Sequence, residues 1–195
     1  MYGKDEIAWC LDVVQPVLNC SLKGSRRLQL TSVQSQLIDA ELLSTMKSSL
    51  MCISKKADYA YSFSCRDAEV SHLYQHISFG GNGYQIGHTT DAFNKRTILF
   101  SGIEVKPDDE GKKEVLAQLS IRLNATLEKM RRLQVLAKGS QPVPMNLLPT
   151  VGLTVIGHDW YTYIAYRLED EMGSVASSQS CVHVLMRYCS TLSAQ

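Results

Sequence analysis

No long apolar run, no large excess of one charge and no closely paired cysteines occur in this sequence of 195 residues. The longest apolar stretch, Val151 to Ile156, is far too short to cross a bilayer, so we expect no association with a membrane. The 20 basic and 19 acidic residues give a net charge of +1, which excludes a protein-wide basic field for nucleic acid. Such a chain is long enough for a real hydrophobic core, and we expect a single domain over residues 1–195.

The six cysteines are scattered without a CxxC pair, and the first residues lack the basic and apolar regions of a signal peptide. We therefore expect reduced thiols in an intracellular protein, the nucleus being one of the compartments that this admits.

Two common ligand-binding motifs are also missing. The turn Gly80–Gly83 has neither the GxGxxG nor the GxxxxGK[ST] spacing of a phosphate-binding loop. His72 and His76 have the spacing of a helical metal pair, but the Glu of an HExxH motif is absent, so the sequence does not favour a zinc site.

Hydrophobic periodicity predicts a succession of helices and strands. We expect helices over residues 5–22, divided at Pro16, over 33–43, over roughly 25 residues after an acidic start at 108–110, and from 174 onward. We expect strands over residues 57–63 and 96–107, and a hairpin of 150–156 with 160–168 around the turn Gly157-His158-Asp159.

The strand around Glu104 and Lys106 carries the most informative pattern. Both ionisable side chains project from the same face, because strand side chains alternate with a period of two. Burying a carboxylate and an ammonium on an apolar strand is costly unless they are paired or bind a ligand. One interpretation is therefore a satisfied ion pair in an unrelated α/β protein, and the other is a functional site.

Asp58 and Gln118 can complete such a site. Asp58, at the start of the strand 57–63, faces Glu104 if the two strands are neighbours; alternatively it caps a turn before the strand. Gln118 lies on the long helix between Glu114 and Arg122 at spacings of four, so the three residues form either an exposed ladder or a face turned toward the site.

This set of groups suits a hard cation. Asp58, Glu104 and the backbone carbonyl of Val105 provide oxygen ligands of the kind that Mg²⁺ prefers. Such an ion lowers the pKa of a bound water and stabilises charge on a phosphate, and Lys106 can position or deprotonate that water.

The ordered motifs resemble the PD-(D/E)XK nuclease superfamily and, more narrowly, the PD-(D/E)XK nuclease-like domain of many fungal proteins. The motifs that carry the resemblance are Ser54-Lys-Lys-Ala-Asp-Tyr-Ala60, Gly102-Ile-Glu-Val-Lys-Pro107, Ala117-Gln-Leu119 and Gly157-His-Asp-Trp-Tyr161, within residues 5–192. Two departures are Ala57, where the superfamily name has proline, and residues 169–179, where we expect a further strand.

The resemblance implies a restriction-endonuclease-like α/β/α sandwich around a mixed central sheet. It implies that Asp58 and Glu104 bind Mg²⁺ (or Mn²⁺), that Lys106 is the catalytic lysine and that Gln118 faces the site. Glu41, or else Asp39, takes the place of an additional helical acid found in some members. DNA is the implied partner, and a homodimer is an option because many nucleases of this fold cut both strands as dimers.

Two classes of function follow. The first is a Mg²⁺-dependent nuclease that hydrolyses phosphodiester bonds in DNA. The second is a non-catalytic module of the same fold that binds DNA or a protein, or acts as an effector. The near-neutral charge favours the second, because a nuclease that grips many phosphates usually has more basic residues.

Overall fold

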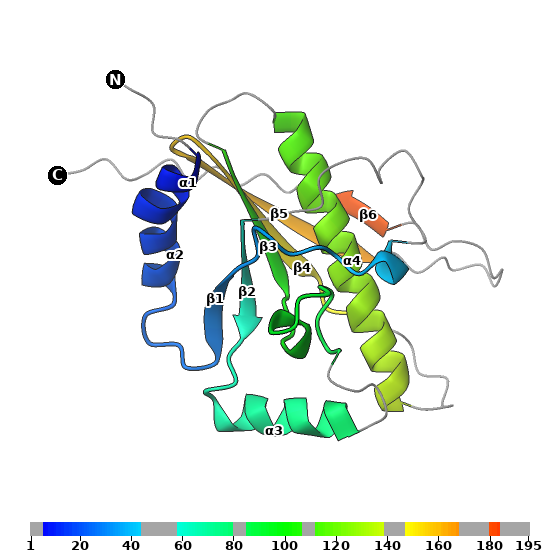
Figure 1. The fold of residues 1–195 in the computed structure, drawn as a ribbon. Coiled ribbons are helices and arrows are strands. Elements are labelled where there is room, and N and C mark those ends of the chain that lie inside the picture. Colours follow the sequence, from blue (N-terminus) through cyan, green and yellow to red (C-terminus); the bar gives the residue numbers. More distant parts are fainter. Residues whose placement is uncertain are drawn as a thin grey trace.

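Six strands form one mixed sheet in the part of the chain that the computed structural model describes, which is residues 6–43, 58–79, 85–106, 112–138, 147–167 and 180–183. They lie side by side in chain order (Figure 1): β1 (Leu28–Ser32), β2 (Tyr59–Phe63), β3 (Ser101–Lys106), β4 (Thr150–Ile156), β5 (Asp159–Arg167) and β6 (Ser180–His183). Neighbouring strands are antiparallel except β3 and β4, which run parallel.

The parallel pair requires a crossover, and the long helix α4 (Lys112–Lys138) provides it. Its apolar stripe, which includes Leu119, Leu123 and Leu127, packs on Tyr163 and Ala165 of β5. At Gly152 of β4 a Cβ atom would lie 2.8 Å from Leu123 Cδ1, so the glycine lets α4 approach the sheet closely. The sequence prediction of a long helix here is confirmed.

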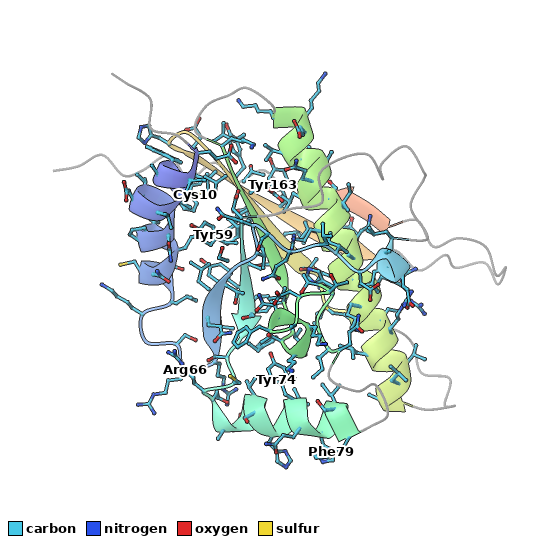
Figure 2. All side chains as sticks on the ribbon, in the orientation of Figure 1. Cys10, Tyr59, Arg66, Tyr74, Phe79 and Tyr163 are labelled. Carbon is cyan, nitrogen blue, oxygen red and sulfur yellow. The ribbon has the colours of Figure 1, made fainter. Side chains whose placement is uncertain are left out.

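The other face of the sheet is covered by the N-terminal helical segment. It consists of α1 (Glu6–Trp9), a π-helical turn (η1, Cys10–Val14) and α2 (Gln15–Ser21), with Pro16 in the first turn of α2. Figure 2 shows Cys10 and Tyr59 in the space between this segment and the sheet, where they share a buried cluster with Ile103 and Val105. Figure 1 shows α4 on the opposite side, so the predicted α/β/α sandwich is confirmed.

The helix predicted over residues 33–43 is wrong. After β1 the chain instead forms an irregular segment and then one 3₁₀ turn, η2 (Ala40–Leu42). The buried side chains in this segment go to different places: Val33 packs with Ala60 and Leu99, whereas Ile38 packs with Ile121 of α4. Backbone groups bond to the loop around His88 rather than to a helical turn, as in the 3.0 Å bond from Asp39 N to His88 O. Tertiary contacts therefore decided the conformation.

Helix α3 (Ala68–Ile77) was not predicted, because only Val70 and Tyr74 of its residues are buried. Asp67 begins it, accepting bonds from the amides of Glu69 and Val70. Tyr74 points from α3 toward the sheet (Figure 2), where its hydroxyl donates to Phe63 O at 2.8 Å.

At the end of the chain, residues 180–183 form β6 rather than part of the predicted helix, and they pair with β5. The remainder of that helix, the acidic start at 108–110 and the turn at 80–83 lie outside the described residues. Among the helices that the structure describes, none combines the length and the apolarity needed to span a bilayer.

Candidate active site

Asp58 and Glu104 lie close together, Asp58 just before β2 and Glu104 on the neighbouring strand β3. β2 and β3 are antiparallel, with Tyr59 opposite Ile103, and both of these side chains belong to the cluster under the N-terminal helices. Because side chains alternate along a strand, Glu104 is directed to the other face, which α4 covers, whereas the carboxylate of Asp58 bonds the backbone of β3. The expected proximity of the two strands is therefore confirmed.

Asp58 is held at the point where the pairing of β2 with β3 ends. Its amide donates to Ile103 O at 3.1 Å, and its Oδ2 accepts a hydrogen bond from the amide of Val105 at 2.7 Å. Gln34 Nε2 donates to Oδ1 at 3.3 Å. The amide and the carbonyl of a strand residue point to the same side, so the carbonyl of Val105 is also directed toward Asp58.

Glu104 is a buried carboxyl group with one unsatisfied oxygen. The residue is 4% exposed, and Oε1 has no hydrogen-bond partner. Burial raises the pKa of Glu104 well above its ordinary value; the charge of Asp58 adds to this, while Arg122 and Lys106 oppose it. Burial also raises the pKa of Asp58, against the hydrogen bond from Val105.

This donor set fits a divalent ion of the magnesium type. The carboxylates of Asp58 and Glu104 act on each other, Asp58 bonds the backbone at Val105, and a buried oxygen of Glu104 lacks a partner; all of these groups offer oxygen donors. No group of three or more His, Cys, Asp or Glu side chains within the described ranges is placed to hold a metal ion. A metal ion here would therefore have two side-chain ligands and one main-chain oxygen, and water would complete its coordination.

Lys106 extends from the end of β3 and makes an ion pair that the sequence did not suggest. Its Nζ lies 2.9 Å from both carboxylate oxygens of Glu6 in α1. Burial lowers the pKa of Lys106, but the hydrogen bond and charge of Glu6 outweigh it, and the net pKa is raised. Lys106 is therefore an ammonium group at neutral pH.

Glu6 is a residue of the site that the sequence analysis missed. An acid in the first turn of a helix ordinarily reads as favourable to the helix dipole, so nothing local marked it. Glu41 and Asp39, which were predicted as the additional helical acid, lie away from Lys106. Asp39 caps η2, and Glu41 lies beside Arg132. Arg132 is fourteen residues beyond Gln118 on α4, roughly 21 Å along the helix.

The polar face of α4 is exposed at Glu114 but buried at Gln118 and Arg122, so it is not an exposed ladder throughout. Gln118 is buried and donates from Nε2 to Glu114 Oε1 at 3.1 Å, and Arg122 is only 1% exposed. Glu114 acts electrostatically on Lys106, and Arg122 acts on Glu104. Gln118, which lies between them on the helix, is therefore level with the part of β3 that carries Glu104 and Lys106.

The turn between β4 and β5 borders the same end of the sheet. Gly157, with a φ of 57°, donates its amide to Lys106 O at 2.8 Å. The ring of His158 meets Trp9 of α1 edge-on at 5.2 Å, and Lys112 lies 6.0 Å from the ring centre of Tyr161. The turn that contains the GHDW motif therefore lies at the edge of the candidate site, where it contacts β3 and α1.

The histidine pair is not part of this arrangement. His72 and His76 lie on α3 with ring centres 5.3 Å apart, and among the described residues no group of three or more His, Cys, Asp or Glu side chains could hold a metal ion there.

Comparison with known proteins gives one match. A family model described as the PD-(D/E)XK nuclease superfamily matches residues 1–189, a range that includes Asp58, Glu104, Lys106 and Gln118. No curated protein and no solved structure gives a significant match. Nucleases of this superfamily generally use divalent metal ions, whereas the fungal origin implied by the sequence stays a prediction.

Proposed function

Because the chain belongs to the PD-(D/E)XK nuclease superfamily, we propose that it is a metal-dependent nuclease that hydrolyses phosphodiester bonds in DNA. The observation that carries the proposal is the proximity of Asp58, just before β2, to Glu104 on β3, with Glu104 Oε1 buried and unpartnered. Lys106, two residues farther along β3, supplies a positive charge at the same edge.

Asp58, Glu104 and the carbonyl of Val105 would hold the ion, which we propose to be Mg²⁺ or Mn²⁺. A bound ion of this kind lowers the pKa of a water molecule and neutralises charge on the phosphate. Glu104 has to lose its proton before it can bind the ion, because burial and Asp58 raise its pKa.

Lys106 and Gln118 act on the substrate in this proposal. The raised pKa of Lys106 keeps it protonated, which favours positioning water and stabilising negative charge over removing a proton. Glu6 holds the ammonium group in place through two hydrogen bonds. Gln118 offers an amide from the α4 side, where it can orient water or a phosphate oxygen.

DNA is the proposed partner, and a second copy of the chain is proposed for cutting both strands. Since the net charge is only +1, contacts with phosphates have to come from local basic residues such as Lys112 at the rim of the site.

A cleavage assay tests the proposal. Purified protein with Mg²⁺ or Mn²⁺ should cut double- or single-stranded DNA, and EDTA should stop the reaction. Lys106→Ala should lower the rate at least about 100-fold, the loss typical of one electrostatic or acid–base group. The matched control is Lys23→Ala, an exposed lysine between α2 and β1, which should cut as fast as the unmodified protein. Equal cutting by Lys106→Ala would overturn the assignment.

The alternative is a non-catalytic module that binds DNA or a protein. One observation favours it: both oxygens of Glu6 already engage Lys106, so the ammonium group is occupied. The two functions differ in Glu6→Gln, which frees Lys106. A nuclease should change its rate in this variant, whereas a binding module should remain unable to cut with either metal.

A further inference from the structure

Helix α1 and the turn between β4 and β5 meet beside Lys106. Figure 1 shows α1 next to this turn, and the contact between them is made by two rings. The ring centres of Trp9, at the end of α1, and His158, in the turn, are 5.2 Å apart, and the ring planes are inclined at 80°. Aromatic rings attract each other in this edge-on arrangement. The contact therefore attaches the helix to the turn.

Both partners of this contact are linked to Lys106 as well. Glu6 and Trp9 are three residues apart on a helix and so lie on the same face. Both carboxylate oxygens of Glu6 accept hydrogen bonds from Lys106 Nζ at 2.9 Å. On the side of the turn, the amide of Gly157 donates to Lys106 O at 2.8 Å. Lys106 is thus held at its side chain by α1 and at its backbone by the turn that carries His158.

The ion pair is too exposed to hold the helix in place by itself. The side chain of Glu6 is 42% exposed and that of Lys106 is 28% exposed. In such a pair water screens the attraction, and two long side chains lose freedom when they are held in one geometry. The position of Glu6 has to be set by other contacts of α1, and these are made by Trp9.

Trp9 has one contact with the core and one with the turn. It packs against the buried cluster that contains Cys10 and Ile103, which fixes it to the sheet. Its second contact is with His158, whose side chain is exposed. Replacing His158 therefore removes the contact with Trp9 and leaves the buried core intact.

We propose that His158 is a positioning residue of the candidate site: its ring holds Trp9, and with it the start of α1, so that Glu6 keeps the ammonium group of Lys106 in one place. The use of this arrangement in catalysis rests on the proposed nuclease function. It matters there because a displacement of about 1 Å in a catalytic group can lower a rate roughly 100-fold. The arrangement itself, an ion pair that depends on an aromatic contact, requires neither metal nor DNA.

The test is an NMR measurement of the lysine ammonium groups in metal-free protein without DNA, with Lys106 assigned as the signal missing from Lys106→Arg. Ammonium protons held in hydrogen bonds exchange slowly with water, so the unmodified protein should give a sharp Lys106 signal. Glu6→Gln and His158→Ala should both lose this signal. His158→Phe, which keeps a ring beside Trp9, should retain it.

The matched control is His76→Ala, because His76 is likewise an exposed histidine in an edge-on ring contact, with His72 on α3. This variant should keep the Lys106 signal. The proposal is overturned if the signal stays sharp in folded His158→Ala, if His158→Phe loses it, or if the unmodified protein lacks it. Should His158→Ala fail to fold, His158→Asn takes its place with the same outcomes.

Cleavage kinetics separate this inference from the proposed function. In a protein that cuts DNA, His158→Ala should lower kcat roughly 10- to 100-fold and leave KM nearly unchanged, because His158 acts on the position of Lys106 and not on the binding of substrate. It should cause no further loss in Glu6→Gln, since both changes disturb the same ion pair. An additive loss, or a change in KM alone, would contradict the role of His158.

The two experiments fail independently. If the Lys106 signal depends on His158 but the unmodified protein cuts no DNA, the nuclease proposal fails and the positioning role of His158 stands. If the protein cuts DNA but its Lys106 signal is the same in His158→Ala, the positioning role alone fails.

Discussion

Glu104 is the residue at which the requirements of stability and of metal binding conflict. Its carboxyl group is buried, one oxygen has no partner, and the charge of Asp58 opposes ionisation. The protonated form of Glu104 is therefore the more stable one in the metal-free protein, while a bound cation would require the ionised form. Such a conflict is characteristic of functional sites, where groups needed for activity often lower the stability of the folded protein.

The pH dependence of stability follows from the raised pKa of Glu104. The ordinary pKa of a glutamate side chain is 4.5, and the folded-state pKa of Glu104 lies well above it. The contribution to stability is thus fully present below about pH 4.5 and is lost as the pH rises through the folded-state pKa. Without metal, Glu104→Gln should therefore be more stable than the unmodified protein at pH 8, by about 1–3 kcal/mol, and nearly equal to it at pH 5.

Thermal unfolding in EDTA from pH 5 to pH 8.5 measures this difference. Asp58, whose pKa is also raised, should leave a smaller residual slope in Glu104→Gln. Glu69→Gln on α3 is the control, because that glutamate is exposed and pairs with Arg27 at the surface. Parallel pH profiles for Glu104→Gln and the unmodified protein would exclude a buried, protonated Glu104.

At this scale the sequence identified the residues whose position depends on local periodicity. Glu104 and Lys106 share a strand face by spacing alone, and Asp58 was expected opposite Glu104 if the strands were neighbours. The ion pair of Glu6 with Lys106 and the burial of Arg122 could not be predicted from local periodicity. Both depend on which helix packs beside which strand end, and a single sequence without tertiary contacts does not contain that information.

Helix α4 is the element that joins the layers of the molecule. Its residue Glu128 is buried and bonds three arginines: Arg131 and Arg132 on the same helix and Arg167 on β5. Arg132 Nη2 also donates to Glu41 O in η2 at 2.9 Å. One carboxylate therefore ties the helix to a strand and, through Arg132, to the irregular segment before β2.

The arginines around Glu128 predict a loss of stability in acid. The hydrogen bond from Arg131 is the largest cause that lowers the pKa of Glu128 to about 2, against burial, with Arg132 and Arg167 adding to it. Because the folded-state pKa is depressed, the contribution is present above about pH 4.5 and is lost as the pH falls toward 2. Glu128→Gln should lower stability at pH 7 by about 2 kcal/mol, since it leaves three partly buried guanidinium groups without their counter-charge.

Denaturant unfolding at pH 7 and pH 3 checks this expectation, and the deficit of Glu128→Gln should shrink at the lower pH. The matched control is again Glu69→Gln, whose surface ion pair should contribute at most about 1 kcal/mol. A deficit that stays constant between the two pH values would show that the ion cluster does not act through its charge.

Elements were predictable from the sequence where their pattern was strong and local. The apolar stripe of α4 and the β-branched run of β4 indicated the correct structures, because each buries a continuous face. The prediction for residues 33–43 was wrong because its apolar residues at helical spacings do not form one face. Leu37 is exposed, and Val33 packs in a different cluster from Ile38, Leu42 and Leu43. β6 was not predicted because a strand of four residues is too short to show a clear alternation of apolar and polar side chains.

On the scale of the whole molecule, two helical layers enclose the sheet and the candidate site lies at one end. That end is formed by the start of β2, the end of β3, the first turn of α1 and the first half of α4. Only the crossover between the parallel strands β3 and β4 brings Gln118 and Arg122 back over Glu104. The sandwich fold thus assembles residues that are up to 116 positions apart, Glu6 and Arg122, and that assembly is what a linear pattern does not reveal.

Calorimetric titration of the purified protein with Mn²⁺ at pH 8 tests most directly whether Asp58 and Glu104 form a metal site. The unmodified protein should bind one Mn²⁺ per chain, Asp58→Ala should abolish that binding, and the control Glu69→Gln should retain it. Asp58→Ala binding the ion as tightly as the unmodified protein would contradict the site described above, as would the absence of any binding by the unmodified protein.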